Sequence, residues 1–281
     1  MKSVAQHHQN HFFGTWDKSK SNLKEYHLMI FLDYDGTLTP IVDDPSKAFL
    51  PPLTKQLITA LARMPGVEIV VISGRALSEI KRLVGISGLT YVGNHGFEIE
   101  GPSMRHVHPS SEQTAKLLFR IAKQLNKAFK IYPGISVENK KLTLSIHYRN
   151  LEDKTVNEAK KLFEKILEPY VTTKQAEVIE GKKVWEIRPA LAWNKGATVL
   201  WLFERSVAAL NFVILPIYIG DDQTDETAFH SLKRNGLTIR VTDNPFEETH
   251  AKYFLRGPEE VVEFLKRIKG LKVETTGANP N

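Results

Sequence analysis

Two carboxylates follow directly on an apolar segment near the start of the chain. Asp33 and Asp35 come after the run 29–32, and Gly36 and Thr37 follow them. An apolar run of this length predicts a buried strand, and Asp-Gly-Thr is typical of the turn that ends one. Ligands of open α/β sheets bind at the carboxyl ends of the parallel strands. The two acids are therefore candidates for a polar site at that edge, although an Asp-Gly pair equally suits an ordinary surface turn.

Other apolar segments also lead to residues that could do chemistry. Ser73 follows one apolar run, Lys195 precedes a predicted helix, and Asp221, Asp222 and Asp225 follow another apolar run. Taken singly, the paired acids could cap a helix and the lysine could be exposed. Taken together, acids from two strand ends supply enough oxygen ligands for Mg²⁺, while Lys195 and Ser73 suit phosphate oxygens. The set predicts phosphate chemistry assisted by a divalent cation.

Apolar strands that alternate with helices must position these residues. This alternation predicts a parallel sheet covered by helices on both faces. Pro216 is expected to shorten its strand to the second half of 213–219. The predicted elements are strands at 29–32, 67–72, 91–92, 97–99, 237–241 and 253–255, and helices at 53–64, from Leu77, at 196–209 and at 258–268.

Residues 109–189 follow a different pattern. Helical periodicity over 112–128 and 153–168 is followed each time by a hairpin signature, which predicts an αββαββ unit with an antiparallel sheet. Alternation along its strands places polar side chains opposite the helices. That face is either solvated or the polar side of a lid over a polar ligand. Its members are Ser136, Glu138, Thr143, Ser145, His147, Arg149, Glu186 and Arg188.

Composition narrows the class of protein. With 281 residues, 42% of them hydrophobic, the chain can build one large core and a smaller domain. No apolar run approaches 18 residues and the polar N-terminus lacks a signal-peptide segment, so a soluble cytoplasmic protein is expected. The absence of cysteine excludes disulfides, thiolate metal sites and cysteine nucleophiles. A net charge of +6 without long charge blocks argues against a nucleic-acid partner.

The ordered motifs resemble those of the haloacid dehalogenase superfamily. They are Asp33-Tyr34-Asp35-Gly36-Thr37, Ser73-Gly74-Arg75, Lys195 and Gly220-Asp221-Asp222-x-x-Asp225. Five further segments are similar to the trehalose-6-phosphate phosphatase family, so that the resemblance covers roughly 27–268. They are Gly93-Asn94-His95-Gly96, Val137-Glu138-Asn139-Lys140, His147-Tyr148-Arg149, Trp185-Glu186-Ile187-Arg188-Pro189 and Asn194-Lys195-Gly196.

The resemblance implies a Rossmann-like α/β core with an inserted α+β cap domain. The expected division is a catalytic core at 27–108 and 190–269 and a cap at 109–189. A polar N-terminal arm at 1–26 and a tail at 270–281 are expected to be loosely ordered, although His7, His8 and His11 could bind a metal.

The resemblance also implies roles for individual residues. Asp33 would attack phosphorus and Asp35 would act as acid and base. Mg²⁺ would be held by Asp33, the Asp35 carbonyl and Asp221, with Asp222 and Asp225 in support. Ser73 and Lys195 would hold phosphate oxygens. Glu138, Lys140 and Glu186 match sugar-binding positions of the cap, and further substrate-binding candidates are Thr37, Arg75, Asn94, His95, Arg149 and Arg188. A histidine between turn residues, as at position 95, equally suits a structural role.

Three functions remain open at this point. The leading one is Mg²⁺-dependent hydrolysis of trehalose 6-phosphate by a monomer with no membrane partner. A second is hydrolysis of another sugar phosphate, such as sucrose phosphate or a mannosyl phosphate. A third is a non-catalytic sugar-phosphate sensor, which is disfavoured because a binding module needs neither a nucleophile nor an acid. The cap motifs alone separate the first two.

Overall fold

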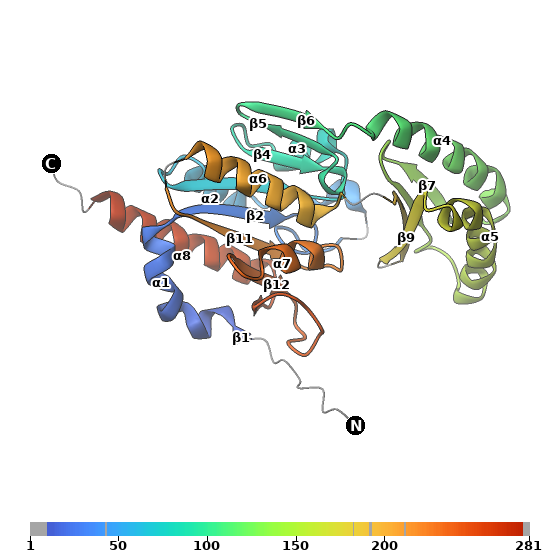
Figure 1. Ribbon diagram of the computed structural model, residues 1–281. Coiled ribbons are helices and arrows are strands. Elements are labelled where there is room, and N and C mark those ends of the chain that lie inside the picture. The colour runs from blue at the N-terminus through green and yellow to red at the C-terminus, as the bar shows by residue number, and fades with distance from the viewer. Residues whose placement is uncertain (1–9, 43, 182, 191–192, 211, 278–281) are drawn as a thin grey trace, which may run out of the picture. The chain divides into compact units, whose positions relative to one another are not determined.

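The chain folds into two compact units, of which the second is inserted in the first. The computed structural model describes residues 10–42, 44–181, 183–190, 193–210 and 212–277 (Figure 1). The first unit joins residues up to Arg105 with those from Trp193 onward, and the second spans His106–Ala192. His7 and His8 lie outside the described residues. No helix in the described part of the chain is long and apolar enough to span a membrane.

A nine-stranded sheet forms the centre of the first unit. Its strand order is β1-β13-β12-β11-β2-β3-β4-β5-β6. Neighbouring strands from β1 through to β4 run parallel, and β5 is antiparallel to β4. The strands are β1 (Asn10–His11), β2 (His27–Asp33), β3 (Val67–Ile72), β4 (Thr90–Gly93), β5 (Glu98–Gly101), β6 (Met104–Val107), β11 (Ile214–Gly220), β12 (Leu237–Val241) and β13 (Tyr253–Leu255). The predicted α/β core is therefore confirmed.

Alternating side chains of the central strands bury both faces of this sheet. In β2, Leu28 and Ile30 join one apolar cluster, while Met29 and Phe31 join the other. The first cluster is completed by α1 (Trp16–Glu25), α2 (Pro52–Leu61), α3 (Leu77–Val84) and α8 (Pro258–Gly277), and the second by α6 (Lys195–Ala209) and α7 (Glu226–Leu232). The helices thus exclude water from β2 and β11, the strands that lead to the acids.

The two ends of the described chain are more ordered than the sequence suggests. Residues 10–25 form β1, the 3₁₀ turn Phe12–Thr15 and α1, and α8 continues to Gly277 rather than ending before Gly270. The expectation of a loosely ordered arm and tail is wrong here because buried apolar side chains anchor both segments. Phe12 is fully buried, with its ring edge-on to Phe264 at 5.3 Å, and Leu271 is also in the core.

Pro216 does not shorten its strand, contrary to the prediction. β11 runs from Ile214, and Pro216 pairs with Met29 of β2. On the other side, pairing with β12 begins only at Ile217. Proline lacks an N–H group and is tolerated where one side of the strand has no partner. The local pairing, which the sequence does not display, therefore removes the cost of this proline.

The inserted unit has its own core and antiparallel sheet. Its sheet order is β7-β8-β10-β9, and helices α4 and α5 supply much of its apolar cluster. Trp185 is buried at the centre of the cluster and stacks on Tyr148 at 4.4 Å and on Phe163 at 4.8 Å. Its elements are α4 (Ser111–Ala128), β7 (Ser136–Asn139), β8 (Leu144–His147), α5 (Asp153–Thr172), β9 (Ala176–Gly181) and β10 (Val184–Pro189). The predicted αββαββ order is confirmed.

The register of the parallel strands brings the first unit's motifs to one edge. Leu32 of β2 pairs with Ile219 of β11, and Asp33 pairs with Ile72 of β3. The residues that follow these strands therefore leave the sheet side by side. This is the carboxyl edge, where α/β proteins bind their ligands.

Candidate active site

A buried lysine joins the acids of the two central strand ends. Lys195 is the first residue of α6, and the Asn194 side chain caps this helix by accepting a hydrogen bond from the Ala197 N–H group. The Lys195 Nζ donates to Asp33 Oδ1 at 2.7 Å and to Asp225 Oδ1 at 2.6 Å. All three side chains are at least nine-tenths buried. Lys195 is therefore held as an internal cation rather than as an ordinary exposed lysine.

Burial and the charge of Lys195 dominate the electrostatics of this cluster. Burial raises the pKa of Asp33 well above its ordinary value. The charge of Lys195 lowers this pKa, while the charges of Asp225 and Asp221 raise it. Burial likewise raises the pKa of Asp225 to about 6. Burial lowers the pKa of Lys195, but the negative charges of Asp225 and Asp33 raise it by more, so the net shift of this pKa is upward. A single lysine thus leaves the acids short of positive charge.

The same acids can hold a divalent cation. One carboxylate oxygen each of Asp33, Asp221 and Asp225 lies within 4.8 Å of the others. Carboxylate oxygens are the ligands that Mg²⁺ prefers, and a cation here would stabilise the ionised form of Asp33, whose pKa is raised mainly by burial and further by Asp225 and Asp221. Asp225 has the least capacity to bind a metal of the three. Its Oδ1 already accepts hydrogen bonds from Lys195 and Tyr218, and its Oδ2 accepts one from the Asp222 N–H group. Asp33 and Asp221 fit best as direct ligands.

The absence of a side chain at Gly36 leaves room for the Asp221 carboxylate. The backbone of Gly36 has φ +85°, and a Cβ atom there would overlap the carboxylate, reaching 2.7 Å from Asp221 Oδ1 and still closer to Oδ2. Thr37 is fully buried and donates its hydroxyl to the same Oδ1 at 3.3 Å. In the first unit Thr37 therefore contacts a candidate metal ligand. The Asp-Gly-Thr turn sets the position of an acid 184 residues away.

Asp35 forms a bidentate ion pair with Arg75 of the Ser73-Gly74-Arg75 motif. The Arg75 guanidinium donates to both Asp35 oxygens at 2.7 Å, and Arg75 also pairs with Glu79 in α3. The guanidinium lies over the Tyr34 ring at 5.9 Å from its centre. Such a bidentate pair fixes the plane of the carboxylate. The structure thus places Arg75, predicted to bind substrate, against the predicted acid and base.

Ser73, Asn94 and His95 lie together at the ends of β3 and β4. Ser73 is buried, and its hydroxyl accepts a hydrogen bond from the Arg75 N–H group at 3.1 Å. Asn94 and His95 both have positive φ, at 47° and 55°, which costs a non-glycine residue free energy. Their N–H groups bond to the carbonyls of Arg75 and Ser73, and the His95 ring packs on Gly74. These contacts tie the β4 turn to the Ser73 loop.

Asp222 has a local structural role in this arrangement. Its Oδ1 accepts hydrogen bonds from the N–H groups of Thr224 and Asp225 and from the Thr224 hydroxyl. Half of its side chain is exposed, at 52%, and Oδ1 lies 4.0 Å from Lys195 Nζ. Asp222 therefore builds the turn before α7, but it does not cap that helix as the alternative supposes, because the N-cap residue of α7 is Asp225. Tyr218 and Glu79, which the motifs do not single out, complete the hydrogen-bond network.

The predicted sugar-binding residues all lie in the inserted unit. Glu138 accepts from His147 at 3.0 Å and lies 3.9 Å from Lys140, and Arg188 donates to Glu186 at 3.1 Å. Glu138 and Glu186 come from β7 and β10, both of which flank β8. Arg149 follows β8. Within this unit, acids and bases are thus paired along one sheet.

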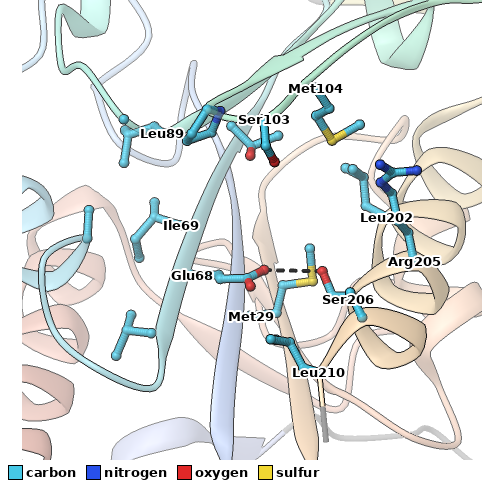
Figure 2. Close-up of a pocket in the computed structure, with 16 residues that line it drawn as sticks. Met29, Glu68, Ile69, Leu89, Ser103, Met104, Leu202, Arg205, Ser206 and Leu210 are labelled. Atoms are coloured by element: carbon cyan, nitrogen blue, oxygen red, sulfur yellow. Dashed lines mark hydrogen bonds between the residues drawn. The ribbon is translucent and has the colours of Figure 1, made fainter. Parts of the chain in front are cut away.

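A cavity in the first unit is lined by residues near the starts of the strands rather than near the strand ends that carry the acids. Figure 2 shows the side chains that line it. Its volume is about 340 Å³, and its lining includes residues near the starts of β2 and β3, such as Met29 and Glu68. Glu68 accepts a hydrogen bond from Ser206 of α6 at 3.3 Å. None of the catalytic candidates lines this cavity. It is therefore separate from the acidic cluster.

The fold and the cluster of acids define a hydrolase of the haloacid dehalogenase superfamily, whose phosphatases use a divalent metal. Residues 31–259 match the family described as trehalose-phosphatase. A probable trehalose-phosphate phosphatase 4 of Oryza sativa subsp. japonica is 36% identical over 258 residues, which cover 90% of this chain and 68% of the relative. Trehalose-phosphate phosphatase B of Arabidopsis thaliana is 32% identical, with 93% and 71% covered.

A solved structure is similar over nearly the whole chain. The C-terminal domain of the Candida albicans trehalose-6-phosphate phosphatase superposes with a TM-score of 0.80 at 25% identity, covering 93% of this chain and 98% of that one. The chain belongs to the trehalose-phosphatase family. It is accordingly a phosphoric monoester hydrolase.

Proposed function

We propose that this enzyme hydrolyses trehalose 6-phosphate to trehalose and phosphate through a phosphorylated Asp33. The observation that carries the proposal is the buried Asp33 carboxylate, held by Lys195 at 2.7 Å and clustered with Asp221. A carboxylate fixed beside a cation and a metal-binding acid is arranged to attack an anionic phosphoryl group.

In the first step, one oxygen of Asp33 attacks phosphorus and the bond from phosphorus to the sugar O6 breaks. Asp35 supplies the proton to the departing sugar oxygen, because an alkoxide is a poor leaving group. Hydrogen bonds from Arg75 to both oxygens fix the orientation of the Asp35 carboxyl group, which follows the nucleophile Asp33 by two positions in the sequence. Trehalose leaves, and Asp33 carries the phosphoryl group.

In the second step, water attacks phosphorus and Asp35 takes its proton. The bond between phosphorus and the Asp33 oxygen breaks, which releases phosphate and restores the Asp33 carboxylate. Lys195 and Ser73 donate to phosphoryl oxygens in both steps. Asp33, the Asp35 carbonyl and Asp221 would hold Mg²⁺, which would supply positive charge to offset that of the phosphoryl group.

The inserted unit, in this proposal, is the cap that selects the sugar. Glu138, Lys140 and Glu186 would contact sugar hydroxyls, with Arg149 and Arg188 in support. Carboxylates accept hydrogen bonds from several hydroxyls, and a sugar that leaves such acceptors unpaired binds less well. The hydrogen bonds with His147 and Arg188 orient the two glutamates on β7 and β10, the strands on either side of β8.

The test of the nucleophile uses two aspartate variants. Asp33→Asn is expected to abolish phosphate release from trehalose 6-phosphate, while Asp17→Asn, the same change at an exposed position of α1, is expected to retain it. EDTA is expected to stop the wild-type reaction and added Mg²⁺ to restore it. Substantial turnover by Asp33→Asn would refute the assignment.

The test of the sugar uses variants of the inserted unit. Glu138→Gln and Glu186→Gln are expected to lower kcat/KM for trehalose 6-phosphate by more than tenfold and to leave an aryl phosphate nearly unaffected. The matched control is Glu180→Gln in β9, where the side chain pairs with Lys160 on the surface. Equal losses on both substrates would count against a sugar-reading role, and faster hydrolysis of sucrose phosphate or a mannosyl phosphate would name a different substrate.

A further inference from the structure

Tyr218 is a fully buried tyrosine of β11 whose ring is locked in place. Tyr218 pairs with Phe31 of β2 in the parallel sheet. The ring stacks on Phe31, with centroids 6.3 Å apart, and meets Phe229 of α7 edge to face at 5.6 Å. Two aromatic neighbours on different elements leave the ring little freedom to turn. Its hydroxyl is therefore delivered to a fixed point.

That point is the carboxylate of Asp225. The Tyr218 hydroxyl donates to Asp225 Oδ1 at 2.6 Å, and the same oxygen accepts from Lys195 Nζ at 2.6 Å. The other oxygen accepts from the Asp222 N–H group at 3.0 Å. Asp225 is further confined by Gly220, where an added Cβ would overlap the carboxylate. Asp225 thus accepts hydrogen bonds from three groups, of which, among the described residues, Tyr218 is the one donor that is neither backbone nor charged.

Lys195 is shared between two acids, and Tyr218 acts on only one of them. Asp225 and Asp33 each accept one ammonium hydrogen bond, at nearly equal distances of 2.6 and 2.7 Å. A second donor on Asp225 Oδ1 weakens the pull of that oxygen on the ammonium group. Without the hydroxyl, the buried Asp225 would be satisfied at Oδ1 by Lys195 alone, which draws the ammonium group away from Asp33.

We infer that Tyr218 is a positioning residue, which acts through Asp225 to hold the Lys195 ammonium group at Asp33 and at the transferring phosphoryl group. This inference rests on the proposed role of Lys195 in phosphoryl transfer. It does not depend on which sugar the enzyme takes, since Lys195 acts on the phosphoryl group common to all phosphate esters.

The experiment compares Tyr218→Phe with Tyr91→Phe. Tyr91 is the matched control because it is also buried in a strand of the first unit and its hydroxyl also donates to an internal acceptor, the Ile86 carbonyl. Both variants keep the ring and lose one buried hydroxyl. We measure kcat and KM on trehalose 6-phosphate and on an aryl phosphate, and the thermal unfolding midpoint of each variant.

Tyr218→Phe is expected to lower kcat by about tenfold on both substrates and to change KM less than about twofold, the scale on which one hydrogen bond to a charged group acts. Tyr91→Phe is expected to lose thermal stability to a similar degree while kcat stays at the wild-type value. A kcat for Tyr218→Phe equal to that of Tyr91→Phe would overturn the inference, as would a loss confined to KM.

The two proposals fail in different ways. If the wild-type enzyme hydrolyses the aryl phosphate but not trehalose 6-phosphate, the sugar assignment fails and the aryl phosphate still tests Tyr218. If Asp33→Asn retains turnover, the nucleophile assignment fails, whatever Tyr218→Phe does. If both variants of tyrosine lose activity in proportion to their loss of stability, Tyr218 serves the fold only.

Discussion

Replacing Gly36 by alanine is expected to weaken metal binding without touching a metal ligand. The Asp221 carboxylate packs against the bare Cα of Gly36, so an added methyl group would occupy space that the carboxylate fills. Bonded neighbours aside, real Cβ atoms essentially never lie closer than 3.0 Å to another heavy atom, and this one would lie 2.7 Å from Oδ1. Oδ1 must therefore retreat by at least 0.3 Å (3.0 − 2.7), and Oδ2 by more.

That displacement exceeds what a magnesium site tolerates. Ligand distances in such sites hold to within about 0.2 Å, and Mg²⁺ demands near-ideal octahedral geometry. Disturbing a residue that supports a ligand typically costs about 10–100-fold in metal affinity. The Mg²⁺ concentration for half-maximal activity should rise by that factor. Alanine at φ +85° also costs about 1–2 kcal/mol of stability through backbone strain alone.

Gly88 supplies the control for the strain. Its φ of +84° matches that of Gly36, but an added Cβ there meets nothing within 4 Å. Gly88→Ala should therefore lose stability by a similar amount and keep the wild-type Mg²⁺ requirement. The assay is phosphate release at increasing Mg²⁺ for the wild type and both variants, with thermal unfolding of each. Equal Mg²⁺ requirements for Gly36→Ala and Gly88→Ala would refute the reasoning.

Three further predictions concern the acid, the inserted unit and pH. Arg75→Lys breaks the bidentate bond to Asp35. It should lower kcat/KM for trehalose 6-phosphate by at least about tenfold more than for an aryl phosphate, because the aryl leaving group needs no proton. Equal losses on the two substrates in steady-state assays would contradict this prediction. Trp185→Ala should destabilise the inserted unit by about 3–5 kcal/mol, measured by urea unfolding, because it empties the centre of that core; a loss below 1 kcal/mol would count against that position. Burial lowers the pKa of His27 below its ordinary value, so its neutral form stabilises the fold above about pH 6.5 and this contribution is lost as the pH falls; urea unfolding at pH 7.5 and 5.5 should show a smaller loss for His27→Gln than for the wild type, and an unchanged loss would exclude this role.

Several features of the site follow from local sequence. The strand at 67–72 was predicted with the bounds of β3, and the run before Asp33 forms part of β2. The positions of the acids after β2 and β11 follow because apolar runs and turn residues are local signals. Parallel strands share a carboxyl edge, so motifs far apart in sequence could be assigned to one site.

Other features depend on side chains that meet only in the folded chain. Arg75 is predicted to bind substrate, and only the structure shows that its guanidinium also pairs with Asp35 and Glu79. Asp225 is predicted to support the metal rather than to bind it directly, and only the structure shows that both of its oxygens accept internal hydrogen bonds. Tyr218 carries no motif signal, because a tyrosine in an apolar strand is ordinary core composition. The order of residues 10–25 depends on apolar side chains such as Phe12 and Leu23, which become buried only in the folded chain.

The sequence by itself determined the class of chemistry and the elements that present it. Residue types, hydrophobic period and turn residues are properties of a few neighbouring positions, and they suffice to place acids at strand ends. Only the tertiary structure decided how the charges are shared: Lys195 bonds an acid 162 positions away, and burial raises the pKa of Asp33. The physical reason is that hydrogen bonding and dielectric environment depend on which strands become neighbours and which helices cover them, and these are decided by packing over the whole unit.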